Sequence, residues 1–271
     1  NDLLYWGLDY PPLTAYVSYL CGIIAQKVVP ALVTLYDSRG HESLEGKIFM
    51  RMTVIVLEIM LFIPVMTAVY SQVVTSWAKG GKVVSTADKY LARLASLILP
   101  GLVLIDHGHF QYNGVCLGLA LLGAYLILEG WDILGSIFFC LSLNFKQMSL
   151  YYAPVFFCFL LRKCLIKPTF ASKVFGVVKL GVTVVCTFGL LWAPFCVFHS
   201  AEDTCVSSLL QVLHRQFPFS RGIFEDKVAN IWYTLSVAVD FRTLLTSQQM
   251  LFSSLGLTLL LLVPTCAYLL T

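Results

Sequence analysis

The sequence predicts an all-α, polytopic transmembrane protein, and three observations support this fold class. Hydrophobic residues make up 58% of the 271 residues and charged residues only 12%, whereas soluble domains carry roughly one quarter charged residues. The mean hydropathy is +0.82. Apolar runs recur along the whole chain between polar turns, and several reach the ~20 residues that a helix needs to cross a bilayer.

The first stretch, residues 1–47, surrounds a carboxylate with aromatic side chains. Asp9 lies between Trp6 and Tyr10, and such aromatic residues are typical of a membrane–water interface. Pro11 and Pro12 follow and favour a defined bend. Asp9 is therefore a candidate functional carboxylate, and the alternative is that it only caps a helix that begins near Pro11.

The next elements are an interfacial or re-entrant helix over 13–29, a polar linker over 36–47 and a first crossing over 48–73. Pro64 predicts a kink in that crossing. Glu58 lies near its middle. A carboxylate inside a membrane is a functional candidate by default, but the interpretation that we favour is a pairing with a polar group on a neighbouring helix.

The remaining chain alternates apolar segments with polar turns. Apolar segments are predicted, in order, over 91–105, 113–128, 132–145, 148–161, 174–198 and 228–241, with a last span from 249. A polar loop separates the fifth of these from the sixth, over 199–227, and a short turn with Arg242 precedes the last span.

Positive charge sets the predicted topology. Basic residues cluster in the loop 76–93 and again over 162–179, and such clusters face the cytosol. The turns 106–113 and 144–147, the loop 199–227 and the segment 1–47 then share the opposite face. The net charge of +3 is too small and too divided to indicate a nucleic-acid partner.

The nine cysteines lie mostly inside apolar runs and form no C-x-x-C pair, which is typical of small packing residues. Cys196 and Cys205 flank a loop and are candidates for a disulfide. The chain opens at Asn1 with no basic n-region and cleavage site, and stops at Thr271 inside an apolar run. We therefore expect residues 1–271 to be one multispanning region truncated at both ends.

One predicted turn is unusually rich in polar and titratable groups, namely Asp106, His107, His109 and Gln111. This density favours a polar substrate-binding turn, with plain helix capping as the alternative. A metal site would need a third ligand beside the two histidines, and no metal signature surrounds them, so we expect no metal.

Cations fall on the same predicted face. Lys146 lies in a tight turn, and His214, Arg215 and Arg221 are interleaved with phenylalanines. Guanidinium groups bind phosphate in a fork geometry, which suits a lipid phosphate. The alternatives are a snorkelling lysine and an interfacial amphipathic segment.

The sequence lacks a Gly-rich phosphate loop and an Asp-x-Asp pair for a nucleotide diphosphate. A carboxylate and cations at one membrane face fit group transfer from a lipid phosphate, with the carboxylate as general base. A lipid transporter or flippase using Glu58, and a non-catalytic scaffold, are the rival interpretations. The transporter would be expected to show inverted repeats, which we do not find.

Four stretches resemble the dolichyl-phosphate-glucose-dependent glucosyltransferases of the endoplasmic reticulum. They are WGLDYPPLTAY at 6–16, HFQYNG at 109–114, FKQMSLYYAP at 145–154 and HRQFPFSRGIFEDKVAN at 214–230. The resemblance spans nearly the whole chain. One departure is Val17, where the family pattern leads us to expect histidine.

This resemblance implies a C-type glycosyltransferase fold in the endoplasmic reticulum membrane, with a lumenal active site and neither metal nor cofactor. The implied reaction adds the first glucose, α-1,3-linked, from dolichyl phosphate glucose to Man9GlcNAc2-diphosphodolichol. The alternative within the family is addition of the second glucose. The choice of glucose over mannose rests on the resemblance alone.

The resemblance also implies residue roles. Asp9 would deprotonate the acceptor hydroxyl, in a catalytic motif that makes 1–47 a lumenal or interfacial loop. The donor phosphate would be held by Arg215, Arg221, His214 and Lys146. The sugar pocket would be shaped by Asp106, His107, His109, Gln111, Tyr10 and Trp6.

Overall fold

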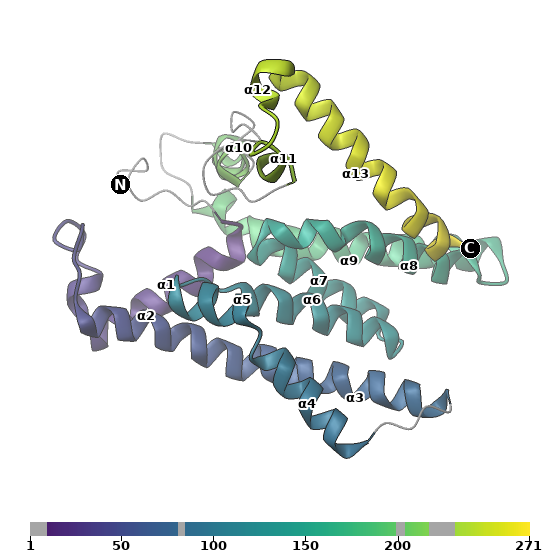
Figure 1. The fold of residues 1–271 in the computed structure, drawn as a ribbon, viewed down its shortest axis with the longest axis horizontal. Coiled ribbons are helices and arrows are strands. Elements are labelled where there is room, and N and C mark those ends of the chain that lie inside the picture. Colours follow the sequence, from purple (N-terminus) through teal and green to yellow (C-terminus); the bar gives the residue numbers. More distant parts are fainter. Residues whose placement is uncertain (1–9, 81–84, 199–203, 217–230) are drawn as a thin grey trace.

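The computed structural model describes residues 10–80, 85–198, 204–216 and 231–271, and throughout these residues the regular elements are helices (Figure 1). Four helical segments are long and apolar enough to cross a membrane: Leu44–Ser76, Gln147–Leu165, Phe170–Val197 and Ser247–Leu270. Two shorter apolar helices, Asn113–Leu128 and Asp132–Phe145, accompany them. The prediction of an all-α membrane protein is confirmed.

The helix α1, Pro12–Val28, begins where the two prolines predict. Proline suits the first turn of a helix because its missing N–H would have no intrahelical partner there. The N-cap residue is Pro11, and Asp9 lies outside the described residues. A short 3-10 turn, η1 over Pro30–Leu32, follows.

The first long helix is continuous but contains one irregular turn. Helix α2, Leu44–Leu57, passes through a π-helical turn, η2 over Glu58–Phe62, into α3, Ile63–Lys79. The irregularity lies just before Pro64, because proline lacks the N–H that would complete the regular ladder. At 1.5 Å per residue the whole helix is roughly 50 Å long. It thus exceeds the ~30 Å of a hydrocarbon core.

The sequence prediction of one span over 91–105 is wrong. An amphipathic helix α4, Thr86–Leu97, begins inside the expected loop 76–93, of which 81–84 lie outside the described residues, and is followed by a short α5, Pro100–Leu102, and a π-helical turn η3, Val103–Gly108. Pro100 separates the two parts because it cannot continue the helix that precedes it. The apolar run is therefore divided and forms no single crossing.

The segment before α13 differs from the prediction at one span. Within the expected loop 199–227 the described residues form a helix, α10, Cys205–Gln216, and residues 199–203 and 217–227 lie outside the described residues. In place of a span over 228–241 there are only α11, Ile231–Leu235, and α12, Phe241–Leu244, within the described residues. Helices of this length are far too short to cross a bilayer. The last span, α13, Ser247–Leu270, is present as predicted.

The centre of the bundle is the helix pair α6, Asn113–Leu128, and α7, Asp132–Phe145. Glycines allow their backbones to approach closely, since a Cβ on Gly135 would lie 2.6 Å from the carbonyl oxygen of Gly123. The 3-10 turn η4, Gln147–Tyr152, then leads into α8, Ala153–Leu165, and α9, Phe170–Val197. Figure 1 shows α2 and α3 along one side of this pair and α8 and α9 along the other.

The two ends of the bundle differ in polar contacts. At one end Lys163 pairs with Asp132, and Gln72 donates a hydrogen bond of 2.5 Å to Glu129. This is the end with the basic cluster of 162–179. The turns around Asp106 and Lys146 lie at the opposite end, as predicted, because α6 and α7 run antiparallel between them. The disulfide Cys196–Cys205, left open by the sequence, joins the end of α9 to α10.

Candidate active site

The candidate site forms where the turn after η3, the start of α6 and the turn after α7 meet. The backbone of this region is strained at Phe110, whose φ of 70° lies in the left-handed region that side chains rarely adopt. Strain of this kind persists where the surrounding structure fixes it, often at functional sites. The ring of Phe110 packs edge-on against Tyr112, with 5.4 Å between centroids.

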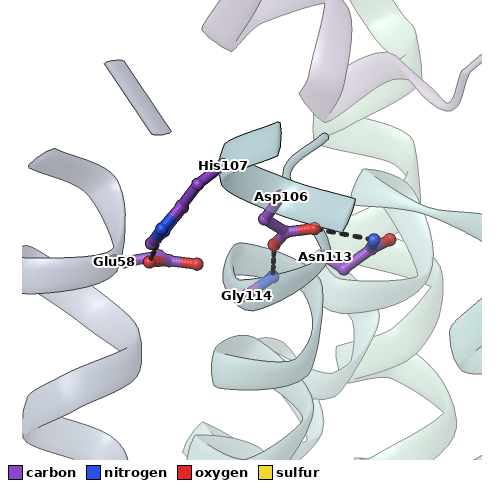
Figure 2. Close-up of polar contacts among 5 residues, drawn as sticks. All are labelled: Glu58, Asp106, His107, Asn113 and Gly114. Carbon is purple, nitrogen blue, oxygen red and sulfur yellow. Dashed lines mark hydrogen bonds and ion pairs between the residues drawn. The ribbon is translucent and has the colours of Figure 1, made fainter. Parts of the chain in front are cut away.

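Asp106 is the anchor of the site and is 0% exposed. One carboxylate oxygen accepts a hydrogen bond of 2.6 Å from the backbone N–H of Gly114, and the other accepts one of 2.7 Å from the Asn113 side-chain amide (Figure 2). Both donors lie in the first turn of α6. A carboxylate is stabilised at this position because the N–H groups there have no helical partner and the helix dipole is positive.

Lys146 faces the same network from the turn after α7 and is 8% exposed. Its Nζ donates a hydrogen bond of 2.6 Å to the Asn113 side-chain oxygen and one of 3.0 Å to that of Gln111. Asn113 therefore donates from its amide nitrogen to Asp106 and, at 3.1 Å, to Gln111, while its oxygen accepts from Lys146. Burial lowers the pKa of Lys146, while its electrostatic interactions, above all with the Asp106 carboxylate, act in the opposite direction.

The backbone around Lys146 is held by neighbouring elements. The Thr14 hydroxyl of α1 donates to the carbonyl oxygen of Phe145, and the Trp192 indole N–H of α9 donates to Asn144 at 2.8 Å. One turn before Lys146, the buried hydroxyl of Ser142 in α7 donates a hydrogen bond of 2.7 Å to the carbonyl oxygen of Cys116 in α6. Three helices thus fix the position of one lysine.

A cavity of about 610 Å³ opens beside this network. Its lining is polar on one side and largely apolar on the other, where η4, α8 and α13 contribute. The ring of Tyr10 lies 5.5 Å from the Nζ of Lys146. The lining residues are Tyr10, Gln111, Asn113, Lys146, Gln147, Met148, Leu150, Tyr151, Pro154, Thr258 and Leu262.

The structure brings some of the predicted site residues together and separates others. Asp106, Gln111, Lys146 and Tyr10 share one network or its cavity. His107 turns away to contact Glu58, with 2.6 Å between Nε2 and Oε2, and His109 is exposed. In the described residues no three His, Cys, Asp or Glu side chains are grouped to hold a metal.

The predicted phosphate-binding cations other than Lys146 lie on or beyond α10. His214 is exposed and Arg215 is half-buried in its last turn. Helix α10 packs against α9, and within the described residues no hydrogen bond joins these two side chains to Asp106 or Lys146. Asp9, Trp6 and Arg221 lie outside the described residues.

Sequence reasoning missed two features of the site, the bridging role of Asn113 and the partner of His107. Asn113 bridges the charges of Asp106 and Lys146, and its position at the start of an apolar run was the available signal. The favoured pairing of Glu58 with a neighbouring polar group is confirmed, but its partner His107 was assigned to the sugar pocket. Glu58 lies level with the start of α6 (Figure 2).

Comparison with known proteins extends over the whole chain. A family model described as the ALG6, ALG8 glycosyltransferase family matches residues 1–271. Similar curated proteins named dolichyl pyrophosphate Man9GlcNAc2 alpha-1,3-glucosyltransferase occur in Gallus gallus, 47% identical over 266 residues, and in Mus musculus, 44% identical over 267 residues. A Dictyostelium discoideum protein with the same name, marked probable, is 44% identical over 268 residues.

These alignments cover 98%, 98% and 97% of this chain but 50%, 50% and 49% of the respective relatives. The chain therefore spans about half the length of the curated relatives that it matches.

Proposed function

The chain belongs to the ALG6, ALG8 glycosyltransferase family, and we propose that it is part of a lumenal enzyme of the endoplasmic reticulum membrane. The proposed reaction transfers the first glucose from dolichyl phosphate glucose to Man9GlcNAc2-diphosphodolichol in an α-1,3 linkage. The names of the similar proteins support this acceptor. The structural observation that carries the proposal is the buried Asp106–Asn113–Lys146 network beside a cavity with one polar and one apolar side.

This cavity suits a lipid-linked sugar phosphate. Two of the three Nζ hydrogens of Lys146 bind Gln111 and Asn113, so one hydrogen remains for a phosphate oxygen. A buried cation interacts more strongly with developing negative charge than one in water does, because the local dielectric is low. The apolar wall of Leu150, Pro154 and Leu262 is suited to the first isoprenoid units of the donor.

The proposed chemistry is a single displacement. The carboxylate of Asp9 takes the proton of the acceptor mannose 3-hydroxyl, and the hydroxyl oxygen forms a bond to C1 of glucose. The bond from C1 to the phosphate oxygen breaks, and dolichyl phosphate leaves with both electrons. Inversion at the β-linked donor gives the α product. The role of Asp9 rests on its motif and on the family, since the residue lies outside the described part of the chain.

Two observations support a lumenal position for the site. The basic end of the bundle, near Lys163, lies opposite to it, which agrees with cytosolic placement of positive charge. The Cys196–Cys205 disulfide joins the end of α9 to α10, and Trp192 in the same last turns of α9 reaches Asn144 beside the site. Disulfides persist in the oxidising lumen.

The decisive experiment uses the full-length protein in detergent with synthetic dolichyl phosphate glucose and Man9GlcNAc2-diphosphodolichol. We expect transfer that resists a chelator in the wild type and falls on the order of 10²-fold or more in Asp9→Asn, because the general base is lost. Unchanged transfer in the variant would place the base elsewhere. A wild type that glucosylates only Glc1Man9GlcNAc2-diphosphodolichol would assign the second glucose instead.

A further inference from the structure

Two π-helical turns from distant parts of the sequence face each other at the edge of the site. One is η2, which begins at Glu58, and the other is η3, which contains His107. Their side chains meet with 2.6 Å between Oε2 of Glu58 and Nε2 of His107 (Figure 2). The Glu58 side chain is 12% exposed and that of His107 is 35% exposed. Single π-helical turns are frequent at functional sites.

Glu58 also occupies the space that Gly114 leaves empty. A Cβ on Gly114 would lie 2.7 Å from Oε1 of Glu58, and the three nearest atoms all belong to this side chain. The backbone N–H of the same glycine binds Asp106. Glu58 therefore contacts two neighbours of Asp106. His107 follows Asp106 in the sequence, and the backbone N–H of Gly114 binds the Asp106 carboxylate.

The consecutive residues Asp106 and His107 are held from opposite sides. Figure 2 shows His107 pointing to Glu58 on the long helix, while Asp106 points to the start of α6. Glu58 is not among the residues that line the cavity. Glu58 is therefore placed to act on the reaction through the turn that it restrains.

We propose that Glu58 is a positioning residue, which fixes η3 through His107 and Gly114 and thereby aims the Asp106–Asn113–Lys146 network at the cavity. The inference rests on the proposed function for its activity readout. It predicts that Glu58 and Gly114 act as one unit. A side chain added at Gly114 displaces the Glu58 carboxylate, and truncation of Glu58 leaves room for that side chain.

The test is a mutant cycle in the full-length protein, with glucosyl transfer as the readout. We expect Glu58→Ala and Gly114→Ala each to lower kcat roughly 10- to 100-fold, as for small misplacements of catalytic groups. The double variant should be no slower than Glu58→Ala, because the Cβ then enters vacated space. Glu58→Gln retains a hydrogen-bond acceptor for His107 and should recover most of the rate.

Gly118→Ala is the matched control. Its Cβ would lie 3.2 Å from Leu61 and 3.3 Å from Phe62 in the same turn η2, so it strains the same helix contact without touching Glu58. Glu58→Ala should not rescue this variant. If the fold-losses of kcat in Glu58→Ala and Gly114→Ala multiply in the double variant, the proposal is overturned, because additive free energies indicate that the two residues act independently.

A second readout does not depend on activity and separates this inference from the proposed function. In the wild type Lys146 is buried and should react slowly with an amine-directed reagent, as measured by mass spectrometry. Glu58→Ala and Gly114→Ala should increase its labelling several-fold, whereas Glu129→Gln at the far end of the bundle should not. Unchanged Lys146 labelling in folded Glu58→Ala or Gly114→Ala would overturn the positioning role even if the wild type transfers no glucose.

Discussion

At the scale of single residues, the site combines one buried carboxylate, one buried cation and an amide that contacts both. Burial of a charge is costly unless other groups satisfy it. Asp106 receives two hydrogen bonds at the start of α6, and Lys146 donates two to amide oxygens. The charges of this network therefore stabilise one another through Asn113, while one donor of Lys146 remains for a ligand.

Lys146→Met tests the role of this donor. The substitution keeps an unbranched side chain but removes the charge, so we expect glucosyl transfer to fall on the order of 10²-fold or more, as when a single stabilising donor is lost. Lys163→Met, at the other end of the bundle, is the matched control and should retain activity. Equal rates for the Lys146 variant and the wild type would contradict a phosphate-binding role.

The same lysine predicts a pH dependence of transfer. Burial lowers the pKa of Lys146, although Asp106 opposes the shift. The ammonium form binds phosphate, so activity that depends on it is lost as pH rises through the lowered pKa. The alkaline limb of the rate profile should thus lie below the ordinary lysine value of about 10.4. A flat alkaline profile from the wild type would argue against this lysine as the titrating group.

At the scale of elements, close backbone contact between α6 and α7 fixes the distance between the two turns of the site. Asn113 begins α6 and Lys146 follows α7, so a change in the spacing of these helices moves the two side chains relative to each other. The contact depends on Gly123 and Gly135, whose missing side chains allow the approach.

Gly135→Ala tests this contact. Its Cβ would lie 2.6 Å from the Gly123 carbonyl oxygen, so the helices must separate, and overpacking of this kind costs about 1–3 kcal/mol. We expect a lower thermal midpoint in detergent together with reduced transfer. Gly181→Ala on α9 meets nothing within 4 Å and should leave both properties near wild type. Equal midpoints for the two variants would show that the helices accommodate the methyl group.

At the scale of the whole molecule, the bundle is polarised. The site and the disulfide lie at one end, whereas the Lys163–Asp132 pair and the basic segment that follows it lie at the other. Glu58 lies beside Gly114 in the first turn of α6. Helix α2, which precedes Glu58 in the long helix, therefore extends beyond the start of α6. The segment preceding Leu44 should therefore project from the same membrane face as the site.

Engineered glycosylation acceptors test this polarity. His41→Asn creates an N-x-S acceptor with Ser43 and should be glycosylated in microsomes, because acceptors are modified only in the lumen. Phe170→Asn creates one with Ser172 at the basic end and should remain unmodified. Both products are compared by gel mobility before and after glycosidase treatment. Modification of Phe170→Asn alone would invert the topology.

The sequence determined the fold class and most helices from local properties. Apolar runs predicted 113–128, 132–145 and the last span within one or two residues of α6, α7 and α13. Pro11 and Pro12 predicted the start of α1. The predictions failed over 91–105 and 228–241, where apolar composition alone did not distinguish a crossing from short or amphipathic helices.

Only the tertiary structure decided which polar groups meet. Asp106 and Lys146 were both expected at one membrane face, but the hydrogen bond from Lys146 to Asn113, which links them, joins residues 33 positions apart. The contact of Glu58 with His107 joins residues 49 positions apart. Local patterns place a residue on an element and at one end of the bundle. Such long-range contacts depend on helix spacing and rotation, which are set by packing at glycines such as Gly114 and Gly135.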